Sequence, residues 1–421
     1  MHEMRNEIEQ EARTAGRFVK AFFQWIVLAL VTGSLGGTVG TAFHWAVNWA
    51  TGLRVSNPWL LWLLPAGGLL IAGLYHLCKM ENENTNAIID SIHFGDKVPL
   101  LLVPCIFLST AITHLFGGSA GREGAALQIG GSLGNYIGRL FHLDEKDMRL
   151  ATLCGMSAVF SALFGTPLTA TIFALEVISV GVFYYSALVP CVVAALVAYG
   201  ISTAFGIPPT RFAAPFEPIQ WLMLLRVSGL AVLCSVMSIV FCLAMHGTEH
   251  LVQKRIPNGY LRIFLGGAAI IGLTYLVGNT DYNGAGMEII SRAIEMGSAR
   301  PTAFLWKLVF TAITIGCGFK GGEVVPTFFI GAALGCVAGP LLGIPAGFAA
   351  ALGLVCVFCG AVNCPMASIV LSVELFGAGD LIYFALACGI AYMLSGYFGL
   401  YSSQKILYSK LRPEFIDIHA R

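Results

Sequence analysis

Long stretches with almost no charge are the feature of this sequence that most limits its fold. Between Ala151 and Thr210 the only charged side chain is Glu176. Residues 301–377 carry only Lys307, Lys320, Glu323 and Glu374. A soluble domain has about 25% charged residues, whereas charged residues make up 11% of this chain and hydrophobic residues 57%. The charge is too sparse to cover a soluble surface, which predicts an integral membrane protein with many spans.

Glycine and proline divide these apolar stretches into short pieces. The 421 residues include 49 glycines, well above the usual share of about 7%. Short hydrophobic segments interrupted by Gly and Pro in both halves are typical of broken helices that meet inside a membrane. We expect helices near 22–50, 58–79 and 97–116, within an all-α transmembrane domain over 21–412 that has many tilted, broken and re-entrant helices.

Two blocks of sequence occur twice in the same order. Residues 121–134 align without gaps with 322–335, and residues 155–176 align with 353–374. Identical residues at equivalent positions include the pairs Gly121 and Gly322, Gly130 and Gly331, Gly134 and Gly335, Gly155 and Gly353, Pro167 and Pro365, and Glu176 and Glu374. Glycine-rich membrane helices can align by composition alone, but the shared Pro-to-Glu spacing argues for an internal duplication. Duplication is the usual build of a secondary transporter and predicts repeat halves at about 22–210 and 220–408.

Both ends of the chain are polar and carry basic residues. Residues 1–20 form a polar amphipathic segment, and residues 413–421 form a short tail. The basic residues near the two ends are Arg5, Arg13, Arg17, Lys20, Lys405, Lys410 and Arg412. The positive-inside rule predicts that both ends lie in the cytoplasm. The net charge is only +1 and no basic patch stands out, so nucleic acid is not an expected partner.

Two glycine-rich turns lead into apolar helices at equivalent places in the repeat. These are GGSAGREGAALQIGG at 117–131 and GGEVVPTFFIG at 321–331. A helix start offers unpaired N–H groups and a positive dipole end, which bind anions, and glycine lets an ion approach the backbone. The candidate anion-binding residues are Gly121, Arg122, Gly124, Val324 and Val325. The alternative is that both motifs only pack helices, since Gly130, Gly134 and Gly138 form a small-residue ladder.

Four glutamates within apolar sequence divide into two kinds. Glu123 and Glu323 follow the glycine turns, where a carboxylate inside a membrane is a functional candidate. A carboxylate at a helix start can occupy the anion site itself, and when protonated it can leave and carry a proton. Glu176 and Glu374 instead end apolar runs at repeat-equivalent positions. We expect them to have a structural role, such as bonding to nearby backbone amides.

Two patterns suggest other chemistry. His246 to His250 matches H-x-x-E-H, an inverted zinc-protease pattern, which would make the chain a membrane metalloprotease. A polar loop after the apolar segment 226–245 explains the match more simply. Cys356 and Cys359 form one C-x-x-C inside an apolar run, without the second pair that a zinc site needs. The twelve cysteines are expected to behave mainly as small hydrophobic residues, and no metal or cofactor is expected.

At these motifs the sequence resembles the CLC family of chloride channels and anion/proton antiporters, over roughly 70–408. GREGA at 121–125 looks like the family's G-K/R-E-G-P motif, which would make Glu123 the external gating glutamate. GGEVVPTFFIGAALG at 321–335 looks like the GxFxP region, and GLYS at 399–402 would make Tyr401 a ligand of the central anion. The resemblance implies a homodimer in the lipid bilayer that transports anions and is not an enzyme.

Three departures from the chloride-handling pattern resemble the fluoride/proton antiporter branch. Where chloride-handling members have G-S-G-I-P, this chain has an Asn84-Thr85-Asn86 sequence. Glu323 stands where an apolar residue is usual, and the internal proton glutamate of chloride exchangers would fall at Val177, which cannot titrate. The branch usually has a threonine where this chain has Val325.

Fluoride fits this set of residues chemically. It is small and strongly hydrated, so it needs short, strong hydrogen-bond donors, which the amides of Asn84 or Asn86 could supply. A protonated Glu323 could donate to fluoride, whereas an ionised one would repel any anion. The expected function is therefore fluoride/proton antiport that exports fluoride across a plasma membrane, with fluoride and protons as partners. A chloride, halide or nitrate antiporter, or a passive chloride channel of the same family, is the alternative.

Overall fold

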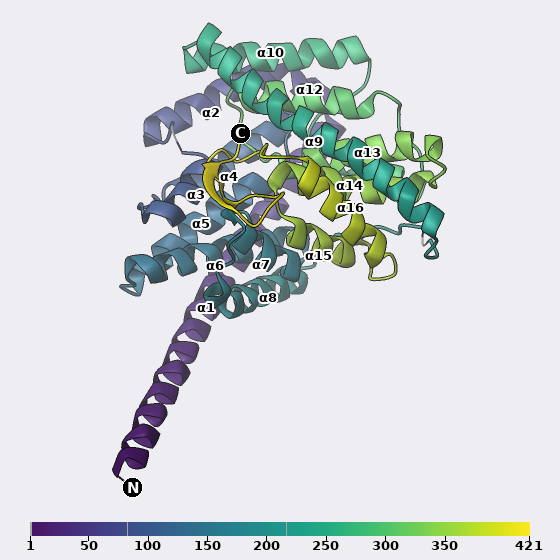
Figure 1. Cartoon of the computed structure of the whole chain (residues 1–421). Coiled ribbons are helices and arrows are strands. Elements are labelled where there is room, and N and C mark those ends of the chain that lie inside the picture. Colours follow the sequence, from purple (N-terminus) through teal and green to yellow (C-terminus); the bar gives the residue numbers. More distant parts are fainter. Residues whose placement is uncertain (1, 82, 216) are drawn as a thin grey trace.

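The computed structural model describes residues 2–81, 83–215 and 217–421, with side chains from residue 14 onward. Sixteen α-helices occur in this described part of the chain (Figure 1). The elements of the first half are α1 His2–Ser56, η1 Pro58–Leu63, α2 Leu64–Cys78, α3 Thr85–Phe94, α4 Leu102–Phe116, α5 Glu123–Leu140, α6 Glu145–Phe164, α7 Pro167–Glu176, β1 Ser179–Val180, η2 Tyr185–Ala187 and α8 Leu188–Ala204. Those of the second half are α9 Trp221–Arg255, α10 Gly259–Val277, α11 Met287–Glu295, α12 Ala303–Gly316, α13 Val324–Leu341, α14 Ala346–Val362, α15 Pro365–Phe376, α16 Leu381–Leu394, β2 Lys405–Tyr408 and β3 Phe415–His419.

The helices fall into long and short classes. Seven helical segments of the described chain are long and apolar enough to cross a membrane, and six further apolar helices have only 10–17 residues. A helix needs about 20 residues to cross the hydrocarbon core, and these six helices are shorter than that. The predicted all-α membrane fold with broken helices is therefore confirmed.

The two halves repeat the same order of elements. Helices α4 to α7 have 15, 18, 20 and 10 residues, and helices α12 to α15 have 14, 18, 17 and 12. Within each half the two central helices pack tightly on one another, α5 on α6 and α13 on α14. In Figure 1 the first-half helices α5 to α8 gather on one side of the body and α13 to α16 on the other.

Glycines allow the closest of these helix contacts. A Cβ on Gly155 of α6 would lie 2.0 Å from the carbonyl oxygen of Gly130 in α5, and a Cβ on Gly353 would lie 2.2 Å from that of Gly331. Neither contact leaves room for a side chain. The glycine ladder in α5 therefore packs helices, which was the alternative interpretation of the motif. The glycine turns before α5 and α13 have a separate role in the contact between the two helix starts.

The two structural glutamates cap each other's repeat. The N–H groups of Met366 and Ala367 donate to the Glu176 carboxylate at 3.1 and 2.8 Å. In the reverse direction, Leu168 and Thr169 donate to Glu374 at 3.0 and 2.8 Å. Helices α7 and α15 both begin with proline, so these are the free N–H groups of each first turn. The predicted bonding of both glutamates to backbone amides is confirmed.

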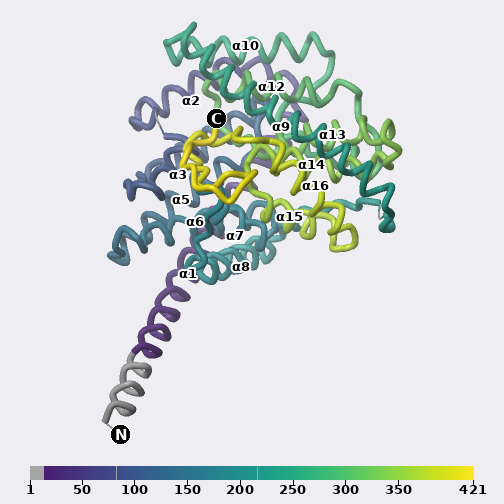
Figure 2. Tube along the Cα trace, in the orientation of Figure 1, coloured from purple at the N-terminus to yellow at the C-terminus, as the bar shows by residue number. Residues whose placement is uncertain are grey.

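Two predicted helix starts are wrong. Helix α1 begins at His2 rather than near residue 22, because nothing in the polar segment stops a helix. Residues 15–24 are exposed and stand clear of the other helices (Figure 2). The side chains of Arg5 and Arg13 lie outside the described residues. The helix expected from residue 97 begins at Leu102, after a turn that follows Gly95, which has a positive φ of 79° and ends α3.

A small sheet near the C-terminus was not predicted. Strand β1 pairs parallel to β2, and β2 pairs antiparallel to β3. The chain end continues these contacts, because Ala420 donates to the carbonyl of Gln404 at 2.9 Å and Gly399 donates to that of Arg421 at 2.9 Å. The predicted short tail at 413–421 is thus largely a strand that contacts the loop of Tyr401.

The glycine contacts predict a position-dependent cost. Gly155→Ala should lower the free energy of unfolding by about 1–3 kcal/mol, because α5 and α6 must move apart. Gly272→Ala in α10 is the matched control, since a Cβ there meets nothing within 4 Å. Its stability should be unchanged or raised by up to ~1 kcal/mol through helix propensity. Thermal unfolding in detergent measures both, and equal stability of the two variants would contradict the packing role.

The reciprocal caps predict a second stability effect. Glu176→Ala removes the acceptor for two amides of α15, and each unsatisfied amide costs about 1–3 kcal/mol. Glu295→Ala, an exposed glutamate at the end of α11, serves as the control. We expect a lower unfolding temperature for the first variant alone, and no difference between them would refute the capping role.

Candidate anion pathway

Two helix starts from opposite repeats face each other at the centre of the molecule. Gly121 donates to the carbonyl of Gly322 at 2.7 Å, and Gly322 donates to that of Gly121 at 2.9 Å. Helix α5 begins two residues after Gly121, and α13 begins two residues after Gly322. This reciprocal pair fixes the free N–H groups of both first turns beside one another.

Close backbone approach explains the glycines of both turns. A Cβ on Gly322 would lie 2.4 Å from the backbone nitrogen of Gly124. A Cβ on Gly121 would lie 2.2 Å from Oε2 of Glu123. Side chains at these positions would therefore separate the two helix starts and displace the carboxylate between them.

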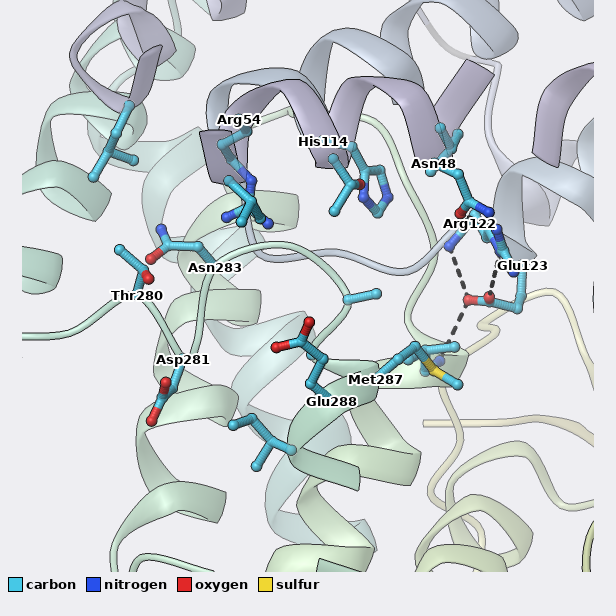
Figure 3. A pocket seen from close by; sticks show the side chains of 18 of the residues that line it. Asn48, Arg54, His114, Arg122, Glu123, Thr280, Asp281, Asn283, Met287 and Glu288 are labelled. Carbon is cyan, nitrogen blue, oxygen red and sulfur yellow. Dashed lines mark hydrogen bonds and ion pairs between the residues drawn. The ribbon is translucent and has the colours of Figure 1, made fainter. Parts of the chain in front are cut away.

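The Glu123 carboxylate joins the two helix starts. Its Oε2 accepts the N–H of Arg122 at 2.9 Å and the N–H of Val325, in the first turn of α13, at 3.4 Å. The side chain is fully buried, and the Arg122 Nε lies 4.0 Å from Oε1. A negative group thus lies on the positive ends of two helices. Figure 3 shows this carboxylate and its bonds.

Glu123 lies at one end of a cavity of about 430 Å³. Asn48 and Arg122 are beside it, while Arg54, Asn283, Thr280 and Asp281 lie toward the other end (Figure 3). The Arg122 guanidinium donates to the Asn48 carbonyl oxygen at 3.1 Å. Arg54 and Arg122 line this cavity together with three carboxylates, Glu123, Asp281 and Glu288, so charges of both signs are present.

A second cavity, of about 180 Å³, lies on the other side of the glycine pair. Five residues singled out from the sequence line it together, namely Asn84, Thr85, Asn86, Glu323 and Tyr401. The Tyr401 hydroxyl and the Glu323 Oε2 are buried without a hydrogen-bond partner in the described chain. Buried polar atoms are normally paired, so these two atoms are candidates for a ligand or a proton.

The polar residues at the start of α3 present donors to this cavity. The carbonyl oxygen of Asn84 accepts the N–H of Ala87 at 3.1 Å, which caps the helix. The carbonyl oxygen of Asn86 accepts the N–H of Ser403 at 3.2 Å. Since both oxygens are used by the backbone, what remains of each amide is its NH₂ group. Thr85 accepts a bond from Gln128 at 3.1 Å.

The loop that carries Tyr401 is held by both repeats. The Gln404 side chain donates to the carbonyl of Val177 at 3.0 Å and to that of Val362 at 2.9 Å. Leu400 donates to the carbonyl of Ala361 at 2.8 Å. Val177 is fully buried in this contact. Its side chain cannot titrate, and its position is also closed to solvent.

The remaining candidates contribute backbone rather than side chains. Gly121 and Gly124 lie in the contact between helix starts, and Val324 is fully buried. Val325 lines the first cavity and offers its N–H to Glu123. The structure therefore brings Glu123, Arg122 and Val325 together at one cavity and Glu323 with Tyr401 at the other.

The lining residues that sequence reasoning missed include Asn48, Arg54, Gln128 and Lys320. Lys320 could have been found, because it is one of few charges in its apolar stretch and precedes the second glycine turn. Asn48 and Gln128 gave no signal, since single amides are ordinary in amphipathic helices.

The H-x-x-E-H residues lie in a helix and not in a polar loop, because α9 runs on to Arg255. The ring of His246 donates from Nε2 to the carbonyl of Gly399 at 2.8 Å. Among the described residues no three His, Cys, Asp or Glu side chains could hold a metal ion. The cysteines are all free, and eleven of the twelve are buried, including Cys356 and Cys359.

Comparison with known proteins gives concordant relatives. The family model described as voltage gated chloride channel matches residues 67–396. A chloride/fluoride channel protein of Pseudomonas syringae pv. tomato is 39% identical over 92% of this chain and 87% of its own length. The crystal structure of a CLC-type fluoride/proton antiporter matches with a TM-score of 0.88 at 34% identity, covering 91% of this chain and 98% of that one. A slow cyanobacterial Cl⁻/H⁺ antiporter shares the fold, with a TM-score of 0.75 at 21% identity over 88% and 94% of the two chains.

With its several spanning helices, the chain is a multi-pass plasma-membrane protein that belongs to the voltage gated chloride channel (CLC) family of anion transporters and channels.

Proposed function

We propose that this protein is a fluoride/proton antiporter that exports fluoride from the cell. The observation that carries the proposal is the pair of carboxyl groups at the facing helix starts, Glu123 toward one cavity and Glu323 toward the other. Relatives whose names include fluoride support the choice of ion.

Glu123 acts as the gate of this pathway. When ionised, it occupies the N–H groups of Arg122 and Val325 and keeps an anion out. When it takes up a proton, its attraction to those amides falls, the side chain leaves, and an anion takes its place. One side chain thereby couples the exit of an anion to the movement of one proton.

Glu323 acts on the other side of the glycine pair. In its protonated form it donates to fluoride, which accepts hydrogen bonds more strongly than chloride does. The amides of Asn84 and Asn86 and the Tyr401 hydroxyl face the same cavity and replace part of the water around the ion. Thr85 lines this cavity as well. Val325 lacks the hydroxyl of the usual threonine but keeps its backbone donor, which supports a working site.

The proposal includes the surroundings of the pathway. The halves at about 22–210 and 220–408 form one domain over 21–412 in the lipid bilayer, with residues 1–20 and 413–421 in the cytoplasm. The second cavity, which the C-terminal loop borders, then faces the cytoplasm. The protein works as a homodimer with one pathway per subunit, needs no cofactor and catalyses no covalent reaction.

A chloride antiporter or a passive channel of the same family is the second candidate. It is favoured by Val325, which departs from the fluoride pattern, and by the chloride antiporter that shares the fold. Val177 argues against the chloride exchanger, since it is buried and cannot carry a proton.

Transport in liposomes separates these functions. The purified protein is reconstituted with a pH dye on one side, and a fluoride or a chloride gradient is imposed. We expect uphill proton movement driven by fluoride and not by chloride. Equal transport of both ions would indicate an anion transporter of this family that does not select fluoride. Fluoride flux without proton movement would indicate a channel.

Substitution of the gate tests the coupling. Glu123→Gln keeps the size of the side chain but cannot carry a proton, so fluoride-driven proton movement should fall to the protein-free background. Glu288→Gln is the control, because Glu288 lines the same cavity away from the helix starts. Intact proton movement in the Glu123 variant would refute the assigned role.

A further inference from the structure

We propose that Glu249 is the proton-relay residue that exchanges protons between the solution at the second cavity and Glu323. The inference rests on the proposed function, because it supplies a proton route on the side where Val177 cannot. It also gives a role to the H-x-x-E-H residues, which form no metal site in the described chain.

The last turns of α9 form one wall of the second cavity. Met245, His246, Glu249 and Gln253 all line it, together with Glu323 and Tyr401. The backbone of Glu249 packs against α12, since a Cβ on Gly316 would lie 3.4 Å from the Glu249 Cα. The Gln253 side chain donates to Oε1 of Glu249 at 3.0 Å. The Glu249 carboxylate is therefore held at this wall by one of its oxygens.

Glu249 and Glu323 have complementary exposure. Glu249 is exposed, so its carboxylate is open to the solution. Glu323 is only partly exposed, and its Oε2 is buried without a partner in the described chain. Both residues line the same cavity. At ~30 Å³ per molecule, a cavity of about 180 Å³ has room for water between them.

A lysine lines the cavity together with these two carboxylates. The Lys320 ammonium donates to the backbone carbonyl of Glu83 at 3.5 Å, and the residue lines the cavity with Glu249 and Glu323. It is itself held 4.1 Å above the centre of the Tyr75 ring. A cation at the same cavity reduces the repulsion between two carboxylates.

Besides Lys320, Glu323 and Tyr401, the charged or titratable groups that line the cavity with Glu249 are His246, Arg262 and Glu81. His246 donates from Nε2 to Gly399, which leaves only Nδ1 to take a proton. Arg262 lines the cavity as a second cation. Glu81 lines it as well, but its carboxylate lies 2.7 Å from the His76 ring.

The relay step changes only O–H bonds. A proton from solution joins the ionised Glu249 carboxylate, which becomes neutral. It then passes through cavity water to the ionised Glu323 carboxylate, so that Glu323 becomes neutral and Glu249 is ionised again. Proton release runs through the same steps in reverse, and no oxidant, reductant or other reactant takes part.

The test compares three variants with the wild type in fluoride-loaded liposomes. Glu249→Gln should slow fluoride-driven proton movement about tenfold or more at neutral pH, because a relay group is lost. Acidification on the second-cavity side should shrink this deficit, since hydronium then reaches Glu323 directly. Glu249→His, which can again carry a proton, should recover most of the rate. Glu81→Gln is the matched control, with the same charge change at the same cavity, and should keep the wild-type rate.

Fluoride binding to the detergent-solubilised protein, measured by calorimetry, separates relay from structure. Glu249→Gln should bind fluoride within about twofold of the wild type. A wild-type rate in this variant would overturn the inference. The inference would also be overturned if Glu249→Gln lost fluoride binding or if its slower proton movement did not depend on pH. An equally slow rate in Glu81→Gln would overturn it as well. A wild type that moves no protons under fluoride would overturn the proposed function, and this inference with it.

Discussion

The rest of the pathway depends on one backbone contact, the reciprocal pair between Gly121 and Gly322. It holds the starts of α5 and α13 together, although their positive dipole ends repel each other. The carboxylate of Glu123 lies between these starts and accepts an N–H from each side. A negative group in this place offsets the repulsion between the two helix ends.

The duplicated backbone carries chemistry that is not symmetric. In the aligned repeats, Arg122 corresponds to Glu323, and Glu123 corresponds to Val324. Glu323 is the N-cap of α13, whereas Glu123 is the first residue of α5. One residue along a helix turns a side chain by about 100°. This offset is a physical reason why the two carboxyl groups face different cavities.

Around this centre the duplication is used for stability. Glu176 caps α15 and Glu374 caps α7, so each repeat satisfies helix amides of the other. The glycine contacts between α5 and α6 and between α13 and α14 bring backbones together where an added Cβ would clash. Inside a membrane, where apolar burial drives helix association little, such packing and hydrogen bonds have to hold the helices together.

The sequence by itself determined the membrane class, the duplication, the two helix starts and the capping role of Glu176 and Glu374. These features are local or periodic, and they follow from charge density, glycine placement and the cost of a carboxylate in an apolar run. It did not determine where α1 begins, because nothing in the polar segment stops a helix. It also missed the strands near the C-terminus. Residues 405–408 form a strand only by pairing with residues 179–180 and 415–419, and this pairing is not visible in the sequence.

Only the tertiary structure decided which side chains share a cavity. Glu123 and Glu323 lie 200 residues apart in the sequence, and the packing of the two repeats places them at two different cavities. The second cavity is lined by residues from three distant segments, namely Glu249, Lys320 and Tyr401. They come together only when α9, the second glycine turn and the C-terminal loop pack against one another. Spacing along a chain reports neighbours within a helix turn, whereas contacts between segments depend on how the helices pack, which no single segment encodes.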